Sequence, residues 1–288
     1  YFYESVLPAL DFVDVNGDGR NDFVGIHKQA LHVFLQDDKG GFGRAKGLDA
    51  GEMDPLKKDE IQLTGFQFDD YDGDGLLDLL GTETTGSIGL MTSLRTKLKL
   101  RMGRKNETPF GKSYDQLILL KGASVMPISV DFNGDGKKDL VTSSLRTDMV
   151  SNLGAVFSSA ITISYFVYAF DAAKREFSTT PILTWNVDAS LGKLSREKYV
   201  PLIYPDRDLT GDGVRDLVQR TEDGAILVFA GQSANHGVPC LPDKATYSFP
   251  IRFGQGVEMD LDKATHFVET INNDKRADIY IQNLAANQ

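Results

Sequence analysis

The sequence has almost no cysteine: among 288 residues, only Cys240 carries a thiol. A single thiol excludes an internal disulfide and any metal site built from several cysteines. Secreted domains often depend on disulfides for stability, so a stabilising cross-link in this chain has to be of another kind. The cysteine count leaves the redox compartment open.

Long apolar runs are also missing. The longest stretches, such as 161–170, contain Thr, Ser and Tyr and fall short of the roughly 18 apolar residues that a membrane-spanning helix needs. No window shows the 3.6-residue helical period with a strength comparable to the strand signals. We therefore expect no membrane insertion and an all-β fold.

Basic residues are outnumbered, with 31 Lys and Arg against 41 Asp and Glu and a formal net charge of −10. A nucleic-acid partner would require compensating basic surface, so none is expected. The hydrophobic content of 41% is that of a soluble globular protein with a substantial core. All-β architectures often reach this length as one unit, which favours a single domain.

What the sequence does contain is a nine-residue pattern that recurs along the chain. Four intact copies, called loops 1 to 4 below, have Asp at positions one, five and nine and Gly at positions four and six: 14–22, 70–78, 131–139 and 208–216. A fifth copy, loop 5 (270–278), begins with Thr270 and has no glycine at position six. We therefore treat loop 5 as degenerate.

The spacing of these loops predicts a repeat architecture. Their first positions, 14, 70, 131, 208 and 270, are 56, 61, 77 and 62 residues apart, which indicates a unit of about 60 residues. Each loop is followed by a short apolar run that is typical of a buried strand, and each intact loop is preceded by another apolar segment. Each intact loop is therefore predicted to connect two strands.

Three or four strands per repeat is the content of a propeller blade, so we predict a β-propeller of about 60-residue blades with the loops between strands. Five repeats are counted, and the chain is either a ring or part of a larger one. The predicted single domain spans 1–288, with repeats at about 8–64, 65–125, 126–201, 202–262 and an incomplete 263–288.

The loop chemistry favours calcium. Oxygen ligands at positions one, three and five, a glycine that permits a sharp turn and a carbonyl at seven suit a hard cation. Calcium accepts six to eight protein oxygens, whereas magnesium tends to keep its waters. The loops contain no His or Cys, which disfavours transition metals.

An EF-hand is the alternative with the same opening residues, but it requires a Glu at position twelve and flanking helices. In the four intact loops, position twelve is Gly25, Gly81, Thr142 and Gln219. The EF-hand interpretation therefore fails, and the Asp at position nine is expected to complete the coordination shell.

The pattern Asp-x-Asn-Gly-Asp-Gly-x-x-Asp resembles the FG-GAP/VCBS repeat family, which includes the propeller of integrin α subunits. The resemblance covers about residues 8–282 and implies four calcium sites and a degenerate fifth. It implies that side chains at positions one, three, five and nine, and the carbonyl at seven, bind Ca²⁺. These residues are Asp14, Asn16, Asp18, Arg20 and Asp22; Asp70, Asp72, Asp74, Leu76 and Asp78; Asp131, Asn133, Asp135, Lys137 and Asp139; Asp208, Thr210, Asp212, Val214 and Asp216; and Asn272, Asp274, Arg276 and Asp278.

Function is predicted at the level of a class. The leading hypothesis is a non-catalytic module for binding, adhesion or assembly that presents a contact surface for a protein or a glycan. It is expected to be secreted or at the cell surface. A variant of this hypothesis places it within a larger surface assembly. The start at Tyr1 instead of Met is expected of a processed or trimmed product. The alternatives are a calcium-dependent polysaccharide lyase or hydrolase, or a lectin, on the same scaffold. No recognised catalytic motif is present.

Two further segments carry expectations. Residues 94–102 alternate basic and mostly apolar side chains, which predicts four cations on one strand face, either as a contact for a polyanionic glycan or as a charged outer strand. The third repeat is longer than the others, and we place its extra length at 143–160 and 186–200, as a specialised contact.

Overall fold

The computed structural model describes residues 9–27, 30–44, 46–48, 61–87, 94–105, 109–111, 113–124, 127–146, 160–190, 203–221, 225–232, 240–250, 264–269, 272, 274 and 276–283. Within these residues the secondary structure consists of β-strands without a helix. Accordingly, this part of the chain has no helix of the length and apolarity that crossing a membrane requires. The expected all-β fold is confirmed.

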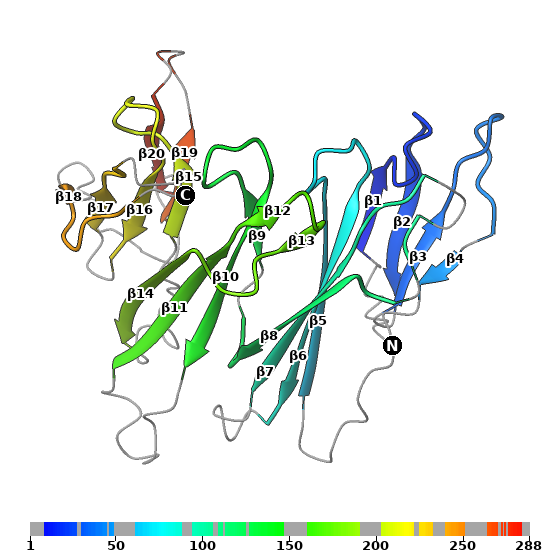
Figure 1. The fold of residues 1–288 in the computed structure, drawn as a ribbon, viewed down its shortest axis with the longest axis horizontal. Coiled ribbons are helices and arrows are strands. Elements are labelled where there is room, and N and C mark those ends of the chain that lie inside the picture. The colour runs from blue at the N-terminus through cyan, green and yellow to red at the C-terminus, as the bar shows by residue number, and fades with distance from the viewer. Residues whose placement is uncertain are drawn as a thin grey trace. The chain divides into compact units, whose positions relative to one another are not determined.

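The strands form four four-stranded antiparallel sheets, the content of a propeller blade, and two pairs (Figure 1). Sheet 1 contains β1 (Ala9–Val13), β2 (Asp22–His27), β3 (Ala30–Phe34) and β4 (Lys46–Leu48). Sheet 2 contains β5 (Ile61–Asp69), β6 (Asp78–Gly86), β7 (Arg95–Arg101) and β8 (Gln116–Lys121). Sheet 3 contains β9 (Ile128–Val130), β10 (Asp139–Arg146), β11 (Ala160–Tyr168) and β14 (Leu183–Ser190).

Sheet 4 contains β15 (Ile203–Arg207), β16 (Asp216–Arg220), β17 (Ala225–Phe229) and β18 (Tyr247–Pro250). The two pairs are the hairpin β12 (Phe170–Asp171) with β13 (Glu176–Phe177), and β19 (Ala264–Glu269) with β20 (Asp278–Asn283). Each sheet is a meander in which neighbouring strands follow one another in sequence, apart from the hairpin inserted between β11 and β14. The prediction of three or four strands per repeat is therefore confirmed for the first four repeats.

Every loop occupies the same place in its sheet. Loop 1 joins β1 to β2, loop 2 joins β5 to β6, loop 3 joins β9 to β10, loop 4 joins β15 to β16, and loop 5 joins β19 to β20. The ninth residue of each loop is the first residue of the following strand. The fold thus presents the candidate ligands at the same connection in all five repeats.

The chain divides into two compact units. Unit 1 comprises 1–129 and 170–179, and unit 2 comprises 130–169 and 180–288. In unit 1, Val24 and Val33 of sheet 1 share a buried cluster with Leu79 of sheet 2. In unit 2, Ile163 of sheet 3 shares a cluster with Leu217 of sheet 4. Each unit therefore has its own core, and the prediction of one domain stays a prediction.

The insertion in the third repeat differs from the sequence-based expectation. Residues 143–146 and 186–190 belong to β10 and β14, while 147–159 and 191–200 lie outside the described residues. The additional element is the hairpin β12–β13, which belongs to unit 1. Its Phe177 packs edge-on against Tyr71 of loop 2, with ring centroids 5.1 Å apart, and the Phe177 N–H donates to Gln116 Oε1 at 2.8 Å.

The expectation of an exposed basic strand at 94–102 is wrong. Strand β7 lies between β6 and β8, so on each face of the sheet its side chains have neighbours from both strands. Lys99 Nζ donates to the buried Glu83 carboxylate at 2.5 Å, and Arg101 is only 1% exposed. The alternation predicted a strand correctly, but sheet order buries two of the four cations.

Candidate functional site

The Asp at position one closes the turn in the first, second and fourth loops. In loop 1, the Asp14 carboxylate accepts hydrogen bonds from the Gly17 N–H at 2.8 Å and the Gly19 N–H at 2.7 Å. Asp70 and Asp208 accept the equivalent pairs of bonds in loops 2 and 4. By accepting hydrogen bonds from the amides at positions four and six, the carboxylate holds the loop in a tight turn.

Positions three and five continue the same local chemistry. Asn16 Oδ1 accepts the Asp18 N–H at 3.0 Å, and Asp18 Oδ1 accepts the Arg20 N–H at 2.9 Å. Both links recur in loops 2, 3 and 5, and the second recurs in loop 4. The side chains at three and five therefore turn inward, and the peptide that precedes position seven is held in place.

Glycine is required at two positions of each intact loop. The glycines at position four have φ between 70° and 76°, and those at position six between 81° and 86°. Other residues rarely adopt this left-handed backbone. The glycine predicted to permit a turn at position six is confirmed, and position four needs one as well. At Gly17 an added Cβ would also lie 2.3 Å from Leu76 Cδ2 of loop 2.

The Asp at position nine is fully buried in all four intact loops: Asp22, Asp78, Asp139 and Asp216 are each 0% exposed. Asp78 shows the arrangement. Its Oδ2 accepts the Tyr71 N–H at 2.9 Å, and its Oδ1 accepts the Gly103 N–H at 2.7 Å. Position nine therefore ties the loop to the segment that follows the third strand, a structural role that the spacing alone did not reveal.

The donor set fits a cation, and loop 2 fits it best. One oxygen from each of Asp70, Asp72 and Asp78 lies within 4.8 Å of the other two, a spacing that one metal ion can bridge. In loop 3, Asp131 Oδ1 is buried without a hydrogen-bond partner, which is costly unless a cation satisfies it. The roles of the individual ligands, including the carbonyls at position seven, remain predictions.

Burial changes the acidity of the carboxyl at position nine. In calcium-free protein, burial raises the pKa of Asp78 to about 7, and the nearby Asp72 and Asp74 carboxylates add to the rise, while the amides of Gly103 and Tyr71 oppose it. Burial also raises the pKa of Asp22. A metal ion would have to supply the attraction that keeps these buried groups ionised.

Chelated protein should therefore lose stability as the pH rises. The folded pKa of Asp78, about 7, exceeds the unfolded value of about 3.9, so between these values the folded state binds more protons than the unfolded state. Urea unfolding in EDTA should show a free energy of unfolding that falls by on the order of 2 kcal/mol from pH 5 to pH 8. A rise over that interval would contradict this assignment, and with excess calcium the fall should disappear.

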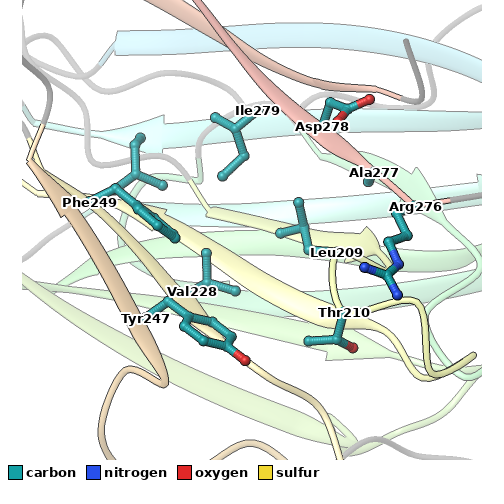
Figure 2. Close-up of a pocket in the computed structure, with 10 residues that line it drawn as sticks. Leu209, Thr210, Val228, Tyr247, Phe249, Arg276, Ala277, Asp278 and Ile279 are labelled. Carbon is teal, nitrogen blue, oxygen red and sulfur yellow. The ribbon is translucent and has the colours of Figure 1, made fainter. Parts of the chain in front are cut away.

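A cavity of about 530 Å³ lies beside loops 4 and 5 in unit 2 (Figure 2). Leu209, Ile226, Val228 and Ile279 supply apolar lining, and Thr210 and Arg276 lie at one end. Tyr247 and Phe249 of β18 form another wall; their rings stack with centroids 6.3 Å apart and they are 50% and 52% exposed. No spacing pattern predicts this pocket, because it is assembled from three strands and two loops.

Comparison with known protein families finds a match for one part of the chain. Residues 14–81 match the model of an FG-GAP-like repeat. This FG-GAP-like segment contains loops 1 and 2 entire, with the four strands β2, β3, β4 and β5 between them. The predicted resemblance is therefore confirmed over these residues.

Two solved structures resemble the fold at low identity. A lectin from Agrocybe aegerita, described as recognising non-reducing terminal N-acetylglucosamine, is 15% identical with a TM-score of 0.47, and the match covers 96% of this chain and 61% of the lectin chain. The Tc holotoxin pore of Photorhabdus luminescens is 12% identical with a TM-score of 0.31, over 96% of this chain and 13% of that chain. No curated protein matches the sequence. At these values neither likeness extends to function.

Proposed function

We propose that the protein is a calcium-stabilised, non-catalytic binding module whose ligand is a glycan. The calcium part is supported by the FG-GAP-like segment and by the Asp70, Asp72 and Asp78 cluster. Of the predicted sites, loops 1 to 4 are the proposed calcium sites and loop 5 the degenerate one. We also propose an extracellular or cell-surface location, because the calcium concentration outside cells suits the affinity that extracellular modules have for calcium.

The pocket of unit 2 is the reason for proposing a glycan as the ligand. Its volume of about 530 Å³ lies within the range of about 300–1,000 Å³ that is usual for small-ligand sites. Half-exposed aromatic rings such as Tyr247 and Phe249 offer flat apolar faces to the C–H faces of a sugar ring, and Tyr247 adds a hydroxyl. Arg276 and Thr210 add donors for sugar hydroxyls or an acidic substituent.

The pocket also connects the ligand to calcium. Thr210 occupies position three of loop 4, and Arg276 and Asp278 occupy positions seven and nine of loop 5. Calcium in loop 4 would order one end of the pocket, so glycan binding is expected to be calcium-dependent. Among the described residues, no comparable feature favours a protein contact surface.

Titration with neutral, N-acetylated and acidic oligosaccharides tests this proposal. Calcium-loaded protein should bind at least one class, and Tyr247→Ala should weaken that binding about tenfold or more, because it removes one stacking face. Tyr114→Ala is the matched control, since Tyr114 is an exposed tyrosine (43%) of unit 1 that does not line the pocket. Equal affinities for both variants would contradict the site, and turnover of any oligosaccharide would contradict the non-catalytic assignment.

A further inference from the structure

Loop 2 carries one more carboxylate than the other intact loops. At position three it has Asp72, where loops 1, 3 and 4 have Asn16, Asn133 and Thr210. Together with the Asp residues at positions one, five and nine, this gives loop 2 four carboxylates and the others three. A cluster of four like charges is costly unless a cation lies close by.

An arginine from a distant part of the chain lies against that extra charge. Arg175 Nε is 2.7 Å from Asp72 Oδ2, and Arg175 Nη2 is 2.9 Å from Asp74 Oδ2. The guanidinium thus bridges positions three and five of loop 2. In the other described ion pairs of the loops, Arg20 contacts Asp18 within its own loop and Arg215 Nη2 is 3.9 Å from Asp131 Oδ2.

The backbone places this arginine in a fixed position. Arg175 has φ of 56°, the only non-glycine residue with positive φ in the described chain, a conformation that favours Gly or Asn. The hairpin that carries it is anchored by Phe177, whose ring meets Tyr71, and by the hydrogen bonds between Gln116 and Phe177. Both anchors lie in unit 1 with loop 2.

The guanidinium of Arg175 contacts the carboxylate oxygens of loop 2 that do not accept the hydrogen bonds of the turn. Asp72 Oδ1 accepts the Asp74 N–H, and Asp74 Oδ1 accepts the Leu76 N–H, as the equivalent side chains do in loops 1 and 3. The remaining oxygen of each carboxylate is bonded to Arg175. A calcium ion entering loop 2 therefore meets a positive charge on two of its expected ligands.

We propose that Arg175 is a built-in competitor for calcium at loop 2, which stabilises the empty loop and lowers the calcium affinity that its four carboxylates would otherwise give. The inference rests on the proposed calcium sites and adds a regulatory difference among them. Filling loop 2 with calcium displaces the guanidinium from Asp72 and Asp74. Arg175 stabilises the empty loop more than the filled loop. By linkage, the calcium affinity of loop 2 falls by the same factor.

Calcium titration of Arg175→Asn by isothermal calorimetry tests the competition. Asn tolerates the left-handed backbone at this position, so the variant should fold. We expect one site to bind about tenfold more tightly, as for the removal of one nearby charge, with the number of sites unchanged. In EDTA the variant should melt below the wild type, and in saturating calcium the two should melt alike.

Lys174→Asn is the matched control. It removes the same charge from the same turn, but Lys174 is 68% exposed and pairs with Asp171 at 2.8 Å, away from loop 2. Its calcium affinities should stay within about twofold of the wild type, since an exposed charge is screened. Unchanged or weaker affinities in Arg175→Asn would overturn the competitor role, whereas an absence of calcium binding by the wild type would overturn the proposed function itself.

Discussion

Chelation of calcium is expected to lower the melting temperature of the wild-type protein by at least about 10 °C. A site held at about 100 times its dissociation constant contributes about 2.7 kcal/mol, and each unit contains two intact loops, so the sites of one unit contribute on the order of 5 kcal/mol. For a unit of this size, about 1 kcal/mol shifts the melting temperature by roughly 2–4 °C. Differential scanning calorimetry with EDTA and with calcium measures the difference directly.

The physical reason is the charge that each loop gathers. Asp14, Asp18 and Asp22 converge in loop 1, where burial raises the pKa of Asp22 and the carboxylates of Asp18 and Asp14 add to the rise. A divalent cation turns this repulsion into attraction, which links metal binding to folding. No disulfide offsets the loss, since the only cysteine, Cys240, is a free exposed thiol.

Magnesium added back at the same concentration is the control for this experiment. It should restore little of the lost stability, because Mg²⁺ keeps its waters and seldom accepts an all-protein set of ligands. Full restoration by magnesium would point to a general ionic effect. An identical melting temperature with and without chelator would mean that the loops are turns only.

Asp216→Ala is expected to be the most damaging single substitution in unit 2. Asp216 is fully buried, and its carboxylate accepts N–H groups of Leu209, Thr210 and Gly231 at 2.7, 2.9 and 2.8 Å. Each buried amide left without a partner costs about 1–3 kcal/mol. The free energy of unfolding should therefore fall by about 4 kcal/mol or more in urea titrations, even in the presence of EDTA.

The condition with EDTA separates this structural role from metal binding. If Asp216 served only as a ligand, its replacement would cost nothing in the absence of calcium. Asp243→Ala in the same unit is the matched control, since Asp243 is exposed, and it should change the free energy of unfolding by less than about 0.5 kcal/mol. A similarly small effect of Asp216→Ala would refute the hydrogen-bonding role.

Local patterns made the loops and their flanking strands predictable. The order of Asp, Asn and Gly in 14–22 specifies a turn through contacts between residues a few positions apart, such as Asp14 with Gly17 and Gly19. The apolar residues on either side specify strands in the same way. Because these interactions are local, four sheets and five loop connections follow the spacing of the repeats.

Interactions between distant segments could not be predicted. The alternation at 94–102 predicts an exposed basic face for β7, because alternation indicates a strand and not its neighbours. The amide of Gly103 that binds Asp78, and Arg175, which lies 101 residues from Asp74, have no signal in the spacing. The pocket beside Tyr247 combines strands of sheet 4 with β20.

The sequence by itself determined the repeat, the class of fold and the oxygen-rich composition of the loops, because their signals are local patterns of nine residues that recur along the chain. The tertiary structure decided which carboxylates are buried and which one meets an arginine. It also decided where an aromatic pocket opens, because packing brings together segments that the chain keeps far apart. The four intact loops are nearly equivalent in sequence, and their tertiary neighbours make them different.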